Sequence, residues 1–112
     1  MRDLQRLRKA AERGDRDSQF ELGGLYRIGE GVRRNRVAAL RWFYLAAWAG
    51  DSDADMQVTL LGDQLEIEKR KRALASALRW KLKRDMSSVI GRMLETSDLI
   101  SDEPPVSDHY GG

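Results

Sequence analysis

Apolar residues recur every three to four positions along most of this chain, which is the spacing of one face of an α-helix. The pattern predicts helices over residues 3–13, 17–28, 35–49, 53–65, 68–83 and 87–97. The helix at 35–49 is apolar on two faces, so it must have neighbours on more than one side. We therefore predict an all-α fold of about six helices.

Glycines mark the expected turns between these helices. Gly14 and Gly50 follow the first and third helices, where glycine supplies the left-handed backbone that closes a last turn. Gly29 and Gly31 are expected to serve positive-φ positions in the turn after the second helix. Gly23 and Gly24 fall in mid-helix at a cost of about 1 kcal/mol each relative to alanine. Close approach of a neighbouring helix is the expected compensation.

Two short segments of the chain are repeated. Ala10-Ala11-x-x-Gly14-Asp15-x-Asp17 returns 36 residues later as residues 46–53, and Ala39-Leu40-Arg41-Trp42 returns 38 residues later as residues 77–80. Asp15 and Asp17 are expected to start the second helix, since either short carboxylate can accept a free N-terminal amide. Periods of this size indicate stacked helix pairs, each of which cannot bury its apolar face alone.

Residues 18–51 resemble a Sel-one-like repeat, a relative of the tetratricopeptide repeat. The resemblance rests on Gln19-x-x-Leu22-Gly23-x-Leu25-Tyr26-x-x-Gly29-x-Gly31-Val32, followed by Ala39-Leu40-x-Trp42-x-x-x-Ala46-Ala47-x-x-Gly50. It implies antiparallel helix pairs stacked as a short α-solenoid with a right-handed superhelix, and an adaptor role in protein complexes. The repeat signature comprises Gly14, Leu22, Gly23, Tyr26, Gly29, Gly31, Ala39, Trp42, Ala46, Ala47, Gly50, Ala77 and Trp80.

The repeats divide the chain into a domain over residues 1–98 and a tail. The domain would consist of a half repeat (3–14), a full repeat (15–50), a degenerate repeat (51–85) and a capping helix (87–97). The degenerate repeat lacks the Gly-x-Gly-Val turn and has Arg84-Asp85-Met86 in place of a closing Ala pair and Gly, as an end cap often does. Residues 99–112 mix acids, Ser and Pro, a composition typical of disordered segments, so we expect a disordered tail.

No residue pattern indicates catalysis, so we expect a protein that is not an enzyme and has no cofactor or metal. His109 is the only histidine and cysteine is absent, which leaves no Cys/His metal set and no Ser-His-Asp constellation within one chain. Alternate carboxylates at 51, 53 and 55 lack the Gly and Glu of a calcium loop and are better explained as helix caps. The glycines at 29 and 31 are explained by the repeat turn rather than by phosphate binding.

Charge is arranged in blocks although the net charge is only +2. Residues 51–68 hold six acids and no base, and residues 69–84 hold eight bases and no acid. Three interpretations stay open: a solvated face with pairing between the two helices, a basic surface for an acidic protein partner, and a contact with nucleic acid through 69–84. Trp80, the counterpart of Trp42, is expected in the core rather than as a stacking platform.

The expected function is binding of another protein, as an adaptor or as a small inhibitor that docks on a larger enzyme. A nucleic-acid-associated protein is the alternative, and homodimerisation would extend a short stack. In tetratricopeptide-like domains the concave face, lined by the first helix of each pair, usually holds a partner peptide, and here those helices are 17–28 and 53–65. The candidate partner-binding residues lie on these helices and in the basic blocks: Gln19, Arg27, Arg33, Arg34, Gln57, Gln64, Lys69, Arg70, Arg72, Arg79 and Lys83.

The sequence also bears on the compartment. The first residues have no apolar run after their basic residues, and no window approaches the ~18 apolar residues of a membrane span. Together with the absence of cysteine, this predicts a cytoplasmic protein with no membrane partner.

Overall fold

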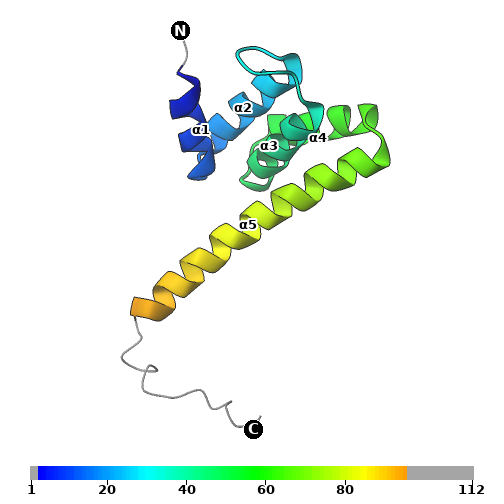
Figure 1. The fold of residues 1–112 in the computed structure, drawn as a ribbon. Helices are drawn as coiled ribbons and strands as arrows, with labels where there is room; N and C mark the ends of the chain where they lie inside the picture. The colour runs from blue at the N-terminus through cyan, green and yellow to red at the C-terminus, as the bar shows by residue number, and fades with distance from the viewer. Residues whose placement is uncertain (1–2, 96–112) are drawn as a thin grey trace. The chain divides into compact units, whose positions relative to one another are not determined.

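The computed structural model of the protein describes residues 3–95, which form five α-helices and no β-strand (Figure 1). The helices are α1 (Leu4–Glu12), α2 (Arg16–Ile28), α3 (Arg36–Trp48), α4 (Ser52–Gln64) and α5 (Ile67–Glu95). The chain divides into two compact units, Met1–Lys81 and Leu82–Gly112. The all-α prediction is confirmed for the described residues. The predicted tail at 99–112, with His109, lies outside them.

Helix α3 is the central element of the first unit. It packs against α2 on one side and α4 on the other (Figure 1), and α1 packs against α2. Leu40 and Phe43 of α3 lie in a first core cluster with Leu61 of α4 and Ala73 of α5. The prediction that this helix has neighbours on more than one side is confirmed.

A second core cluster lies on another face of α3. Trp42 and Leu45 of α3 pack there with Ala11, Leu22 and Ala77. Helix α1 and the first part of α5 thus each contribute a buried alanine to an apolar cluster that α3 shares. Trp42 is 3% exposed and Trp80 is half-buried beside this cluster, so both indoles of the repeated Ala-Leu-Arg-Trp segment contribute to the core.

The repeated Ala-Ala-x-x-Gly-Asp segment has the same backbone geometry in both copies. The Asp15 N–H donates to the Ala10 carbonyl (3.0 Å) and the Gly14 N–H to the Ala11 carbonyl (3.0 Å). The corresponding bonds 36 residues later, to the Ala46 and Ala47 carbonyls, are 3.1 and 2.9 Å. Gly14 and Gly50 have φ of 100° and 103°. This double bond with a left-handed Gly is a Schellman motif.

The two turns also lie near each other. A Cβ built on Gly50 would be 3.5 Å from Nη1 of Arg16, the first residue of α2. After each turn an aspartate caps the next helix: Asp15 accepts the Ser18 N–H (2.9 Å) and Asp51 accepts the Ala54 N–H (3.0 Å). The predicted capping role of these two aspartates is confirmed.

The Asp15 cap predicts a dependence of stability on pH. Hydrogen bonds from the Ser18 hydroxyl and then the Ser18 N–H hold the pKa of the Asp15 carboxyl below its ordinary value. A depressed folded-state pKa gives stability that is present above the unfolded pKa and is lost as pH falls through the folded pKa. We expect Asp15→Asn, which keeps a capping oxygen but does not titrate, to flatten the acid side of a pH series of urea unfolding curves. Identical acid limbs for both proteins would contradict this.

Gly23 of α2 allows the close approach of α3. A Cβ on Gly23 would lie 2.8 Å from Cε1 of Phe43, whose ring also packs against Phe20 with 5.6 Å between centroids. The predicted compensation for a mid-helix glycine therefore holds for Gly23. It does not hold for Gly24, because a Cβ there would meet no atom within 4 Å.

The described residues hold five helices rather than about six, because the helices predicted over 68–83 and 87–97 are one. Helix α5 runs without interruption from Ile67 through the segment Arg84-Asp85-Met86. The expected break was inferred from where a repeat would end. That segment contains neither Gly nor Pro, so every residue can continue the helical hydrogen-bond pattern.

Candidate functional site: a basic groove

Two adjoining hollows mark the surface of the first unit where the start of α3 meets the α4–α5 connection and the first part of α5. The first has a volume of about 430 Å³ and the second about 410 Å³, and both are bordered by Asn35 and Val37. We call them together the basic groove. The first hollow is lined in addition by Arg34, Arg36, Gln64, Leu65, Glu66 and Lys69, and the second by Ala38, Arg41, Arg72, Ser76 and Arg79.

The lining is strongly positive. Six of its residues are Arg or Lys, and Glu66 is the one acid among the lining residues. Arg36, Arg72 and Arg79 are exposed and form no ion pair with any residue that the structure describes. Pairing of the acidic block 51–68 with the basic block, one of the three interpretations of the sequence, is thus not seen for Arg72 or Arg79. Their positive charge is available to a ligand.

One face of α5 supplies one wall of the groove. Lys69, Arg72, Ser76 and Arg79 recur at spacings of three, four and three residues, which places them on one side of the helix. Ala73 and Ala77, on an adjacent face, are fully buried in the two core clusters. Burial of these two residues in clusters that include residues of α3 fixes which face of α5 is turned to the core, and hence the direction of the basic wall.

The turn into α3 supplies the opposite wall. The Asn35 N–H donates to the Tyr26 carbonyl (2.9 Å), and the Asn35 Oδ1 accepts the Ala38 N–H (2.9 Å), so this residue both closes the turn and caps α3. Gly29 has φ of 81°, and a Cβ there would be 3.0 Å from Cβ of Arg34. The glycine therefore lets the chain fold back and present Arg34 at the groove.

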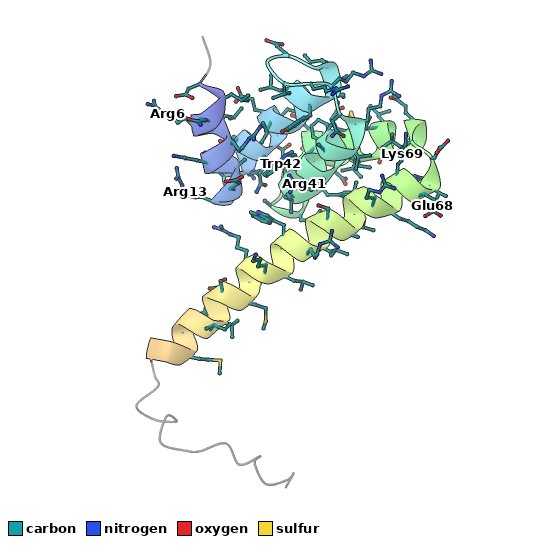
Figure 2. All side chains as sticks on the ribbon, viewed as in Figure 1. Arg6, Arg13, Arg41, Trp42, Glu68 and Lys69 are labelled. Atoms are coloured by element: carbon teal, nitrogen blue, oxygen red, sulfur yellow. The ribbon has the colours of Figure 1, made fainter. Side chains whose placement is uncertain are left out.

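Arg41 is the most buried base of the groove. Its guanidinium carbon lies 4.4 Å from the centroid of the Trp42 ring, a cation–π distance, and Figure 2 shows the two side chains among the helices of the first unit. Burial lowers the pKa of Arg41 from its ordinary value, whereas Tyr26 and Glu12 raise it. Arginine keeps its charge even so. A partly desolvated guanidinium held in place in this way is suited to bind an anion.

Several residues predicted to bind a partner come together here. Arg34, Gln64, Lys69, Arg72 and Arg79 all line the basic groove, and Figure 2 shows Lys69 near the start of α5. The predictions missed Arg41, which lies in an almost wholly apolar helix. A signal existed, because Arg41 and Arg79 hold the same place in the two Ala-Leu-Arg-Trp segments and both line the second hollow.

Other predicted residues lie elsewhere. The prediction that Gln19 faces a partner is wrong: it is 2% exposed, and its Nε2 donates to the Ala11 carbonyl (3.1 Å). Gln57 is half-buried, and Arg27 and Arg33 are exposed away from the lining. Arg70 is half-buried with its Cδ 3.3 Å from a Cβ built on Gly62. Lys83 is exposed in the second unit.

The groove has the chemistry of an anion-binding surface. Its lining offers guanidinium, ammonium, amide and hydroxyl donors. Within residues 3–95, no three His, Cys, Asp or Glu side chains come together in a way that would hold a metal ion. None of the described helices combines the length and apolar character needed to cross a membrane.

Comparison with known proteins identifies no relative, since no protein-family model, curated protein or solved structure matches the chain. The function proposed for the groove therefore rests on its own residues and geometry.

Proposed function

We propose that this protein is a non-catalytic interaction module that binds an acidic segment of another protein in the basic groove. The observation that carries the proposal is the gathering of six bases from two separate parts of the chain, 34–41 and 69–79, around one hollow surface with a single acid. Charges that are brought together in this way attract an opposite surface and set its orientation.

Arginine dominates the groove, and this favours carboxylate ligands. The planar guanidinium donates two parallel hydrogen bonds to a carboxylate, which gives direction as well as charge. Arg41 is partly shielded from water and supported by Trp42, so a contact to it is screened less than one at the exposed Arg36. We infer that Arg41 anchors the acidic segment and that the outer bases guide it.

We propose that the module is built as a short α-solenoid of the Sel-one-like type. The matching Schellman turns at Gly14 and Gly50 and the matching caps at Asp15 and Asp51 support a repeat of 36 residues. An α-solenoid with so few repeats offers a small surface, so binding depends on a few well-placed anchors. Both an adaptor and a small inhibitor of a larger enzyme fit this arrangement.

A charge reversal within the groove tests the proposal. The probe is a short labelled Glu-rich peptide, and its Kd is measured by fluorescence anisotropy at low and physiological salt. We expect Arg72→Glu/Arg79→Glu to weaken binding at least tenfold, or about 1.4 kcal/mol, because four units of charge change in one wall. Rising salt should weaken the wild-type complex.

The matched control has the same change in net charge outside the groove. Arg27 and Lys71 are exposed and do not line either hollow, so Arg27→Glu/Lys71→Glu should change the Kd by about twofold or less. Equal losses for the two double variants would mean that the peptide responds to net charge and that the groove is not its site.

Nucleic acid is the second candidate ligand, because guanidinium groups also bind phosphates. The basic helix segment 69–84 would then follow the backbone. Trp42 is buried and Trp80 is half-buried beside the second core cluster, so neither is presented as a platform for a base. Binding of labelled single-stranded RNA and duplex DNA, measured first at low salt and then as the salt concentration rises, distinguishes the two functions. Binding that is lost steeply with salt supports nucleic acid, and its absence alongside peptide binding supports the acidic segment.

A further inference from the structure

Helix α4, in the first unit, has a stripe of exposed side chains on the side away from the buried Ala54: Asp53, Met56, Leu60 and Asp63. They recur at spacings of three, four and three residues, which places them on one face of the helix. Met56 is 60% exposed and Leu60 is 52% exposed, so two large apolar side chains lie between two aspartates. We call these four residues the acidic stripe.

The charges of the acidic stripe are not neutralised within the part of the chain that the structure describes. Neither Asp53 nor Asp63 forms an ion pair among residues 3–95, and α4 itself contains no base. Asp53 lies in the first turn of α4, where the helix dipole favours a carboxylate, but Asp63 lies in the last turn, where the dipole disfavours one. The stability of α4 alone therefore does not account for Asp63.

The α5 wall of the basic groove has the same spacing as the acidic stripe. Its residues at 69, 72, 76 and 79 also recur at three, four and three positions. The first and last residues of each set are therefore ten positions apart, and they are Asp53 and Asp63 in α4. In α5 they are Lys69 and Arg79. At a rise of 1.5 Å per residue, both pairs span about 15 Å along their helix. When the two faces lie along each other, each aspartate is brought to a base.

We propose that α4 of a second copy of this chain docks along the basic groove, with its acidic stripe against the α5 wall. Residues 51–63 line neither hollow of the groove, so each copy offers both surfaces at once. The contact joins two different surfaces and is therefore heterologous. The proposal rests on the proposed function in that both use the same groove, and it implies that self-association competes with an acidic partner.

The apolar middle of the acidic stripe also meets a matching surface in the groove. Val37 and Ala38 line the groove and are half-buried, and Arg72 offers the aliphatic part of its side chain. Met56 and Leu60 would be removed from water there. Burial of apolar surface adds an attraction that salt does not screen, whereas salt weakens the charge pairs at the two ends.

Sedimentation of the full chain over a range of concentrations at low salt tests the proposal. We expect the wild type to associate, and the stripe variant Asp53→Lys/Asp63→Lys to weaken association at least tenfold. The control Glu30→Lys/Asp55→Lys makes the same change in net charge at exposed positions outside the stripe and the groove. It should alter association by about twofold or less. Circular dichroism verifies that the variants keep their helices. A wild type that is monomeric at every concentration, or equal losses in the stripe variant and the control, would overturn the proposal.

A mixture of two variants tests which surfaces meet. The groove variant Arg72→Glu/Arg79→Glu should also fail to associate by itself, because its own groove repels the stripe. The stripe variant keeps an intact groove and the groove variant keeps an intact stripe. An equimolar mixture should therefore form a complex although neither variant associates alone. A mixture that stays monomeric would overturn the proposal.

The Glu-rich peptide separates this proposal from the proposed function. The stripe variant should bind the peptide at least as tightly as the wild type does, because its groove is unchanged. An excess of peptide should dissociate the wild-type assembly. Peptide binding by a chain that is always monomeric would overturn self-association alone. Self-association that follows the variants as expected, without any peptide binding, would overturn the proposed function alone.

Discussion

Replacement of Trp42 by alanine is expected to lower the free energy of unfolding by about 3 to 5 kcal/mol. The indole is 3% exposed and packs with Leu22, Leu45 and Ala77, which belong to three different helices. Its removal leaves a cavity where α2, α3 and α5 meet and takes away the ring beneath Arg41. Urea unfolding followed by circular dichroism measures the loss.

Trp48 provides the control for this substitution. It lies in the same helix but is 39% exposed, and its ring stacks on that of Tyr44 with 5.6 Å between centroids. Trp48→Ala should therefore cost much less, about 1 kcal/mol. If Trp42→Ala unfolded at the urea concentration of the wild type, the indole would have no part in the core.

Gly23→Ala and Gly24→Ala, which differ by one position, are expected to have effects of opposite sign. The Gly23 Cβ would lie 2.8 Å from the Phe43 ring. That ring is 1% exposed and held by Phe20, so it has little room to move. We expect a loss of about 1 to 3 kcal/mol from overpacking.

At Gly24 the added methyl group meets no neighbouring atom. Alanine there should stabilise α2 by roughly 0.5 to 1 kcal/mol, since it restricts the unfolded chain and suits a helix. Urea unfolding curves of both variants and the wild type measure the two shifts. Shifts in the same direction would show that α2 and α3 do not approach at Gly23.

The first four helices and the turns between them could be predicted because the signals for them are local. The apolar spacing, Gly14, Gly50 and the following aspartates act within a few residues of chain, and the structure has them as expected. Gln19 could not be placed in this way. Its burial depends on a carbonyl of α1, eight residues away in sequence, and nothing in its own segment specifies that contact.

The basic groove could be predicted in part for a similar reason. The bases of α5 form a conspicuous block in the sequence, and their spacing puts Lys69, Arg72 and Arg79 on one face. The position of α3 opposite this face is a matter of tertiary packing and has no local signal in the sequence. It follows from the burial of Ala73 and Ala77 in the two clusters that include residues of α3. Arg41 belongs to the groove because of that packing.

The two Schellman turns have a consequence for how a chain of this kind can grow. Each joint is closed by main-chain bonds among six consecutive residues, from Ala10 to Asp15 and from Ala46 to Asp51. The direction in which the following helix leaves the turn is therefore set by these six residues and does not depend on contacts with distant parts of the chain. If the segment that contains such a turn were duplicated in tandem, each copy would bring the turn that joins it to the next. Additional repeats could therefore be added without changes to the residues of the existing turns.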